Sequence, residues 1–277
     1  MAIDPSADVD YALSSAHRSV WTSGDYALIA EEVMAPIGPV LVGASGLSAH
    51  DRVLDVAAGS GNISIPAAMT GATVVSSDLT PKLLQRSRLR AHKLGVTLQW
   101  READAQALPF ADSEFDVVLS GIGVMFAANH QCAADELVRV CRPGGTISLA
   151  SWTPEGFFGQ MLALIRPYRP TQQPNVPPAA LWGRGDYIGG LLGDRVTEIR
   201  TERRTLWVSR FGTAEAVRDY FKNHYGPVVE AYCAIGDNPV LVNVLDAQIV
   251  ELVRQHLKNG TMGWEYLLVT ARKSMRA

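Results

Sequence analysis

The sequence has few cysteines, no long apolar run and no surplus of basic residues. Its three cysteines, Cys132, Cys141 and Cys233, form no CxxC pair and have no Cys/His ligand spacing, which predicts reduced thiols and no metal site. No uncharged apolar stretch reaches the roughly 18 residues that cross a bilayer. The acidic segment MAIDPSADVD also lacks the basic and apolar regions of a secretory signal. These absences lead us to expect a cytoplasmic protein without a membrane span.

The charge balance argues against a nucleic acid as partner. With 25 basic and 28 acidic residues, the chain has a net charge of −3 and no strong basic field. Hydrophobic residues make up 47% of the chain and charged residues 19%, so a large core can form. A length of 277 residues lies near the upper limit for one core. We expect one large domain, or a core with a cap, in a monomer or a homodimer.

Short apolar segments alternate with helical ones between residues 51 and 152. Apolar runs bounded by turn residues predict strands at 52–56, 72–77, 97–101, 115–120 and 146–151. Helical spacing predicts helices at 81–93 and 133–140, the first with Thr80 in the N-cap position and Pro81 as its first residue. Strands separated by helices indicate an α/β fold with parallel strands joined by right-handed crossovers.

The pattern changes after Trp152. Five prolines between residues 167 and 178 exclude a central strand or a regular helix, and they predict a stiff surface loop after a short helix at 156–165. The remaining expected elements are a strand at 203–210, helices at 214–225 and 239–257, and a last strand at 264–271. Together the elements predict a Rossmann-like sheet of seven mostly parallel strands, with helices on both faces and a helical cap over its ligand edge.

A nucleoside-binding pattern follows the first two strands. Gly59 and Gly61 permit a tight turn after the strand at 52–56 and a close approach of a ligand to the backbone. Asp78 follows about twenty residues later at the end of the second strand, where its carboxylate can accept hydrogen bonds from both ribose hydroxyls. These features fit a dinucleotide-binding fold and a nucleoside-binding fold equally.

Three details favour a positively charged ligand over NAD. Ser64 stands where the NAD fingerprint requires a third glycine. Asp55 places an acid in the turn, which repels a pyrophosphate but suits a ligand with an ammonium and a sulfonium. Asp104 and the backbone N–H of Ala105 follow the third strand and can read an adenine edge. An NAD-dependent oxidoreductase therefore remains as the less favoured alternative.

Four segments in order carry a family resemblance: DVAAGSGN, SSDLT, EADAQALPFADSEFDVVLS and ELVRVCRPGGTISLASW. They resemble the motifs of class I S-adenosylmethionine-dependent methyltransferases, and within them the subgroup of the ubiquinone/menaquinone biosynthesis C-methyltransferases (UbiE-like, methyltransferase domain type 11). The resemblance covers about residues 52–152 and departs from the motif at Ala57. It implies S-adenosylmethionine as cofactor and S-adenosylhomocysteine as product.

The predicted elements and the resemblance together indicate a division of the chain, and the resemblance implies a set of binding residues. We expect an N-terminal helical cover (1–43), a Rossmann-like core that binds S-adenosylmethionine (44–152), a proline-rich loop with the sixth strand (153–212), a helical lid (213–262) and a last strand with the tail (263–277). The cofactor-binding residues that it implies are Trp21, Tyr26, Asp55, Ala57, Gly59, Gly61, Asp78, Leu79, Asp104, Ala105 and Ser120.

Each of these residues has an implied role. Asp55 and the backbone of the glycine turn would hold the methionine part, and Asp78 with Leu79 would hold the ribose and flank the adenine. Asp104 and Ala105 would read the adenine. Ser120 would contact the cofactor near the transferred methyl group. The N-terminal segment WTSGDY, which contains Trp21 and Tyr26, resembles a segment that closes over the cofactor in bacterial relatives.

The methyl acceptor is less well defined. The fourth strand ends in Ser-Gly-Ile-Gly-Val and not in the Asn/Asp-Pro-Pro-aromatic motif of enzymes that methylate exocyclic amines of bases. The predicted helices at 214–225 and 239–257, here called the late helices, and the turn between them are rich in aromatic residues, which favours a small, apolar or aromatic acceptor. We expect transfer of the methyl group by in-line displacement. Candidate pocket residues are His17, Phe126, His130, Tyr220, His224, Tyr225 and Tyr232.

His224, with Tyr225 beside it, is the candidate catalytic group, a base for a hydroxyl acceptor. The alternative is that the imidazole satisfies the last carbonyls of its helix and that the tyrosine packs on the sheet. A further alternative for the whole chain is a catalytically degenerate scaffold that binds S-adenosylmethionine. The retained glycines and carboxylates argue against that alternative.

Overall fold

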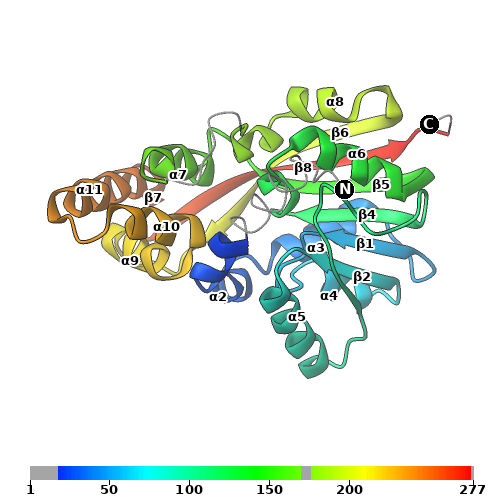
Figure 1. Ribbon diagram of the computed structural model, residues 1–277, viewed down its shortest axis with the longest axis horizontal. Coiled ribbons are helices and arrows are strands. Elements are labelled where there is room, and N and C mark those ends of the chain that lie inside the picture. The colour runs from blue at the N-terminus through cyan, green and yellow to red at the C-terminus, as the bar shows by residue number, and fades with distance from the viewer. Residues whose placement is uncertain (1–17, 170–175, 276–277) are drawn as a thin grey trace, which may run out of the picture.

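The sheet follows the predicted order of elements. The computed structural model describes residues 18–169 and 176–275. Its parallel strands are β1 (Arg52–Val56), β2 (Thr73–Asp78), β3 (Gln99–Glu102), β4 (Phe115–Gly121) and β5 (Cys141–Trp152). The antiparallel strands β8 (Thr261–Lys273) and β6 (Val196–Val208) continue the sheet, and the two-residue strand β7 (Leu257–Lys258) pairs with β8. The main path β3-β2-β1-β4-β5-β8-β6 confirms the predicted α/β fold (Figure 1).

Helices lie on both sides of this sheet. Those of the described ranges are α2 (Tyr26–Glu32), α3 (Ile37–Ser45), α4 (Ser64–Ala68), α5 (Pro81–Lys93), α6 (His130–Val140), α7 (Phe157–Ile165), α8 (Gly185–Leu192), α9 (Ala214–His224), α10 (Gly226–Ile235) and α11 (Pro239–His256). Short 3-10 helices are η1 (Val124–Phe126), η2 (Arg166–Tyr168), η3 (Ala179–Gly183) and η4 (Gly193–Arg195). Helix α3 packs against α4 and strand β5, and α6 packs against α8 and β5.

Local sequence explains where two of the helices begin. Pro81 opens α5 directly after Thr80, as predicted, although the Thr80 side chain makes no capping hydrogen bond. Asn129 caps α6 through its side-chain oxygen, which accepts a hydrogen bond from the backbone nitrogen of Cys132 at 3.1 Å. This cap lets α6 begin at His130, before the predicted start of the helix at residue 133.

The region after β5 differs most from the prediction. Strand β6 begins at Val196, well before the predicted start at residue 203. The sequence does not predict the early start because residues 197–205 are exposed and mostly polar and show no apolar alternation. Such a charged edge strand disfavours pairing with other chains. Helix α8 and η3 occupy part of the segment for which no helix is predicted. The break before Gly226 separates α9 from a further helix, α10.

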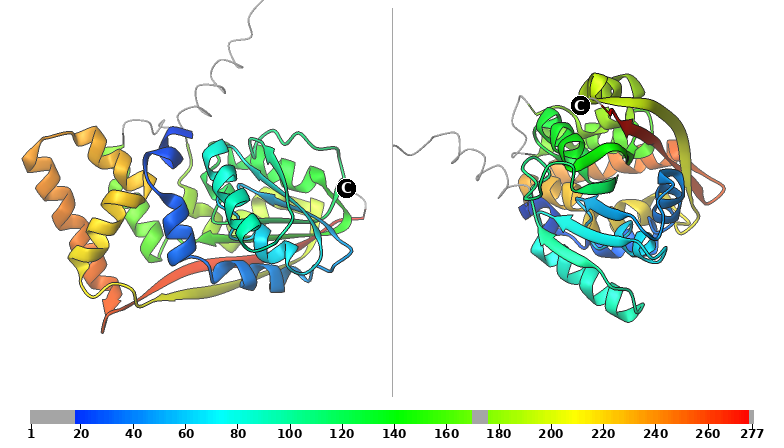
Figure 2. Two further views of the ribbon diagram at one scale, coloured as in Figure 1. Left: turned by 90° about the horizontal axis from the view of Figure 1, so that it is seen from below. Right: turned by 90° about the vertical axis from the view of Figure 1, so that its right-hand side faces the viewer.

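The late helices form a layer with α7 at one end of the long strands β6 and β8 (Figure 1). In Figure 2, α2 lies between this layer and the parallel part of the sheet. Aromatic rings fill the layer: the ring centroids of Phe158 and Trp264 are 4.9 Å apart, and those of Phe157 and Phe221 are 5.9 Å apart. The helices of this layer thus pack around buried apolar side chains, and these side chains belong to the same core as those of the sheet.

No single helix within residues 18–169 and 176–275 has the length and apolar composition needed to cross a membrane. Helices α2 and α3 meet these criteria only when taken together, and they are bent by 74° relative to each other. In the fold, Ile29 and Leu41 of this pair are fully buried in the core.

Two glycines allow the N-terminal segment to pack on the junction of α9 and α10. A Cβ atom at Gly24 would lie 2.3 Å from the carbonyl oxygen of His224, and one at Gly226 would lie 2.1 Å from the carbonyl oxygen of Val20. No side chain larger than hydrogen fits at either position unless the backbone moves. The junction therefore depends on glycine at both sites.

We expect Gly24→Ala to destabilise the protein by about 1–3 kcal/mol, because the added methyl group forces the two backbones apart. Gly43→Ala in α3 is the matched control. A Cβ atom there meets no atom within 4 Å, so alanine should be neutral or stabilising by up to about 1 kcal/mol. Denaturant unfolding of both variants tests this difference, and equal effects would contradict it.

Candidate functional site

One cavity opens at the carboxyl ends of the parallel strands. We call it the strand-end cavity. It is lined by Ala57 and Gly59 after β1, residues 78–80 after β2, residues 103–106 after β3 and residues 122–124 after β4, together with Trp21, Tyr26, Leu83, Phe126 and Ala127. Parallel strands bring these turns to a single edge, where ligands of such sheets bind.

The carboxylate of Asp78 joins two of these turns. Its Oδ2 accepts a hydrogen bond from the backbone nitrogen of Gly59 at 2.8 Å, and its Oδ1 accepts one from that of Thr80 at 2.7 Å. Burial raises the pKa of Asp78, while the two N–H donors act in the opposite direction. Each oxygen of an ionised carboxylate has a second acceptor site, so the group can still bind two hydroxyls in the cavity.

The cavity contains backbone conformations that side chains rarely adopt. Ala57 has a φ of 53° and Ile122 a φ of 58°, both in the left-handed region. The two turns pack closely, since a Cβ atom at Gly123 would lie 2.3 Å from the carbonyl oxygen of Ala57. Left-handed geometry at a β-branched residue costs roughly 1–2 kcal/mol. Strain of this kind is typical of functional sites, and it supports this cavity as the candidate.

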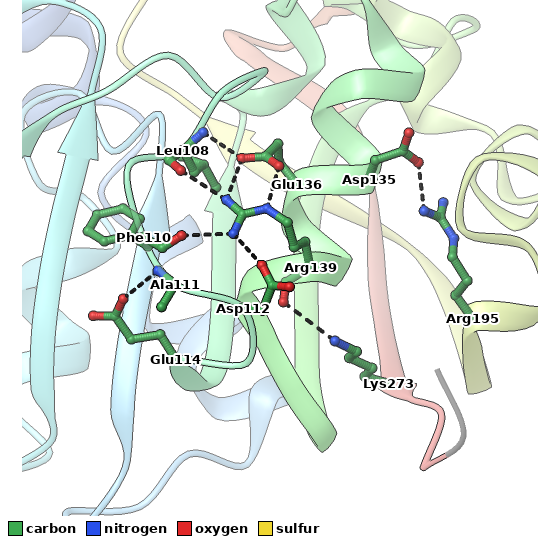
Figure 3. Close-up of polar contacts among 10 residues, drawn as sticks. All are labelled: Leu108, Phe110, Ala111, Asp112, Glu114, Asp135, Glu136, Arg139, Arg195 and Lys273. Carbon is green, nitrogen blue, oxygen red and sulfur yellow. Dashed lines mark hydrogen bonds and ion pairs between the residues drawn. The ribbon is translucent and has the colours of Figure 1, made fainter.

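Helix α6 holds the loop that follows β3 (Figure 3). Arg139 donates hydrogen bonds to the carbonyl oxygens of Leu108 at 2.9 Å and Phe110 at 2.8 Å, and Glu136 accepts one from the Leu108 nitrogen at 2.6 Å. Nearer the cavity, Asp104 Oδ1 accepts a hydrogen bond from the Gln106 nitrogen at 2.9 Å. These bonds position Asp104 and Gln106 on the cavity wall.

Asp55 lies behind the cavity wall and does not line it. Its Oδ2 accepts a hydrogen bond from Ser64 Oγ at 2.5 Å, and its buried Oδ1 has no hydrogen-bond partner among the described residues. Burial raises the pKa of Asp55 to about 7, although the bond to Ser64 opposes this. Ser64, at the position of the absent third glycine, is thus part of a buried polar cluster with Ser76.

Gly61 and Ser120, also predicted to bind the cofactor, lie behind the cavity wall. A Cβ atom at Gly61, whose φ is 88°, would lie 2.6 Å from Ser87 Oγ, so this glycine permits helix packing and not the approach of a ligand. Ser120 Oγ donates to the Val56 carbonyl at 2.7 Å and accepts from the Val124 nitrogen at 3.0 Å. Both positions shape the turns without lining the cavity.

Aromatic side chains cover the strand-end cavity. The ring centroid of Trp21 lies 5.3 Å from that of Tyr26 and 4.7 Å from that of Phe126, both in edge-to-face geometry. A Cβ atom at Gly59 would approach only the Tyr26 ring, at 3.6 Å. The predicted N-terminal residues Trp21 and Tyr26 therefore do line the cavity with Gly59, Asp78 and Asp104. Ala57, Leu79 and Ala105, also predicted, complete the set.

A second cavity of about 340 Å³ adjoins the first, and we call it the helical cavity. The two cavities share the lining residues Trp21, Phe126 and Ala127. The other lining residues of the helical cavity are Val20, Met125, Ala128, Pro154, Gly159, Leu162, Ala163, Arg166, Arg169, residues 176–181 and Pro227. Its wall is mostly apolar, as an apolar or aromatic ligand requires.

The candidate catalytic residues line neither cavity. The ring of His224 packs on Tyr220, with centroids 4.9 Å apart, and its main chain contacts Gly24. Tyr225 is 2% exposed, and burial raises the pKa of its hydroxyl, so it does not ionise near neutral pH. The structure therefore provides no support for His224 or Tyr225 as a base.

The other candidate acceptor residues have structural partners. His130 is buried, with its Nδ1 2.9 Å from the Tyr187 hydroxyl, and burial lowers the pKa of His130 to about 4. Tyr220 donates a hydrogen bond to Glu32, and Tyr232 donates one to Asp246. Of the predicted acceptor residues that the structure describes, only Phe126 lines the helical cavity, and His17 lies outside the described residues.

Several lining residues are not among those that the sequence patterns predict. Ile122 and Gly123 follow β4 in a Gly-Ile-Gly pattern whose second glycine indicates a close backbone approach. Arg166 and Arg169 line the helical cavity three residues apart, in the stretch that the prolines predict to be a loop.

Within the two described ranges, no group of three His, Cys, Asp or Glu residues is arranged to hold a metal ion.

Comparisons with known proteins relate this site to one class of enzymes. The methyltransferase domain family Methyltransf_11 matches residues 54–149. Uncharacterized protein Rv1405c of Mycobacterium tuberculosis is 66% identical over 99% of this chain and all of its own length. The demethylmenaquinone methyltransferase of Thermus thermophilus is 37% identical over 40% of this chain and 52% of its own.

A solved structure shares the fold. Phosphoethanolamine N-methyltransferase 2 of Haemonchus contortus, in complex with S-adenosyl-L-methionine, superimposes with a TM-score of 0.55. The match covers 86% of this chain and 52% of that chain, at 15% sequence identity. At this identity the likeness concerns the fold alone.

The buried carboxyl group of Asp55 generates a pH-dependent prediction. Its folded-state pKa is raised from 3.8 to about 7. Between these two pH values the unfolded chain releases the proton of Asp55 and the folded protein keeps it. The free energy of unfolding therefore decreases as the pH rises through this range. Asp55→Asn removes this dependence. Its stability relative to the wild type should be about 2–3 kcal/mol more favourable at pH 8 than at pH 5. Denaturant unfolding at both pH values measures the difference, and a difference that does not vary with pH would refute the assignment.

Proposed function

Because the chain belongs to the class I S-adenosylmethionine-dependent methyltransferases, in one family with the mycobacterial protein Rv1405c, we propose that it transfers a methyl group from S-adenosylmethionine to a small, apolar or aromatic molecule. One observation supports this most. The strand-end cavity, which contains groups suited to bind a nucleoside, and the mostly apolar helical cavity share a wall of Trp21, Phe126 and Ala127.

The strand-end cavity fits S-adenosylmethionine. Asp78 presents a buried carboxylate that suits the two ribose hydroxyls, and Asp104 with the Ala105 backbone suits the adenine edge. At Gly59 the absence of a side chain leaves the space beside the Tyr26 ring open. The unpartnered Oδ1 of Asp55 adds negative charge behind the wall when the group is ionised, which favours a cationic ligand.

When bound, S-adenosylmethionine supplies a methyl group that is activated by a sulfonium. The chain then has to orient the acceptor and exclude water, since close positioning of two reactants can supply most of the rate. Trp21, Tyr26 and Phe126 cover the cavity, and aromatic faces of this kind attract a cation. The apolar wall of the helical cavity would hold the acceptor against them.

We assign no general base. Within the described residues, none of the histidines lines either cavity, and the hydroxyl of Tyr225 stays protonated. Without a base, the acceptor has to present an electron pair that is already free, on an anion or on a neutral atom, or to lose its proton to solvent before the transfer.

A comparison of ligands tests the proposed cofactor. S-Adenosylhomocysteine at a saturating concentration should raise the melting temperature by several degrees, and NAD⁺ at the same concentration should not. Stabilisation by NAD⁺ alone would favour an oxidoreductase. Formation of S-adenosylhomocysteine from S-adenosylmethionine and an apolar acceptor separates an enzyme from a binding scaffold.

The role of Asp78 generates a second prediction. Asp78→Asn should weaken binding of S-adenosylhomocysteine by about tenfold or more, because the amide loses one of the charged acceptors for the ribose hydroxyls. Asp186→Asn is the matched control, since Asp186 is exposed and pairs with Arg184. Isothermal titration calorimetry measures both variants, and unfolding curves report whether Asp78→Asn remains folded. Unchanged affinity in a folded Asp78→Asn variant would remove this residue from the site.

A further inference from the structure

The helical cavity has a feature that the proposed function does not use. Its lining contains two arginine side chains, Arg166 and Arg169, in a wall otherwise made of apolar residues and glycine. A purely apolar ligand gains nothing from guanidinium groups, which prefer water or an anion. Arg166 is exposed and Arg169 is half-buried, so water solvates the Arg166 guanidinium while the cavity is empty. A ligand that displaces this water has to replace its hydrogen bonds.

The two arginines differ in their partners. Arg169 Nε lies 2.6 Å from Glu230 Oε2, and both side chains are largely buried, so this pair carries no net charge. It links the segment after η2 to α10. The guanidinium of Arg166 forms no ion pair or hydrogen bond with any residue that the structure describes. Among the lining residues that the structure describes, Arg166 thus contributes a positive charge that no acidic side chain balances.

On the basis of the proposed function, we propose that the methyl acceptor carries an acidic group, such as a carboxylate, on its apolar body, and that Arg166 binds this group. A guanidinium offers a planar set of donors that matches a carboxylate or a sulfonate. The apolar wall would hold the remainder of the molecule. This refines the expectation of a small, apolar or aromatic acceptor that the aromatic residues of the late helices suggest.

The acidic group would be an anchor and not the atom that is methylated. Arg166 and Arg169 line the helical cavity, but neither lines the strand-end cavity that would hold the sulfonium. The shared wall of Trp21 and Phe126 lies where the two cavities meet. An acceptor held by Arg166 therefore presents another part of its body toward the methyl group.

A matched pair of fluorescent probes tests the charge preference. 8-Anilinonaphthalene-1-sulfonate and N-phenyl-1-naphthylamine share one apolar body, and only the first carries a sulfonate. Both are titrated with S-adenosylhomocysteine present, so that the strand-end cavity is filled. We expect Arg166→Gln to weaken binding of the sulfonate probe about fivefold or more and to leave the affinity for the neutral probe within about twofold.

Two further variants control this experiment. Arg254→Gln removes an exposed arginine that pairs with Glu215 on the late helices, and it should change neither affinity. Leu162→Trp fills the helical cavity and should weaken binding of both probes. An equal effect of Arg166→Gln and Arg254→Gln on the sulfonate probe would overturn the proposal. Full sulfonate affinity in Leu162→Trp would place the anion site outside the cavity and would overturn it as well.

The same preparations separate this inference from the proposed function. Calorimetry with S-adenosylhomocysteine reports the cofactor site alone, and Arg166→Gln should leave that affinity unchanged. If S-adenosylhomocysteine binds but Arg166→Gln does not alter the sulfonate preference, only the anchor is wrong. If S-adenosylhomocysteine does not bind to the wild type, the proposed function fails, and the anchor that rests on it fails too.

Discussion

The hydrogen bonds of the Asp78 carboxylate hold the site together. One oxygen binds the backbone of Gly59 after β1, and the other binds that of Thr80 after β2, so a single buried group sets the distance between two neighbouring turns. Such charge-assisted bonds are stronger than those between neutral groups. The strained turn at Ala57 lies between the end of β1 and Gly59, and the bond to Asp78 fixes this turn at Gly59. The strand order then brings the turns after β3 and β4 to the same edge.

The chain closes this edge with segments that are distant in sequence. Trp21 comes from the N-terminal segment and Phe126 from the turn after β4, and their rings form the wall between the two cavities. The glycine contacts between the N-terminal segment and the α9–α10 junction hold this wall against the late helices. The strand-end cavity and the helical cavity therefore share Trp21, a residue of the segment that packs on the α9–α10 junction.

The sequence predicted positions along the chain better than side-chain directions. The bounds of β1 and α5 are as predicted, and Gly59, Asp78 and Asp104 line one cavity, because turn residues after parallel strands have few alternative places. His224 packs on Tyr220 and lines neither cavity, because which face of α9 meets a cavity depends on tertiary packing. The place of Arg166 in a cavity wall could not be predicted, since a proline-rich stretch has no periodicity from which to infer which side chains face a cavity.

The strand-end cavity should bind the nucleoside, and the shared aromatic wall of Trp21 and Phe126 should face the reacting group. A crystal structure of the complex with S-adenosylhomocysteine tests this most directly. We expect the ribose hydroxyls within hydrogen-bond distance of Asp78, the adenine beside Asp104 and Ala105, and the sulfur facing the wall of Trp21 and Phe126. A ligand bound elsewhere, or a ribose without contact to Asp78, would contradict the account.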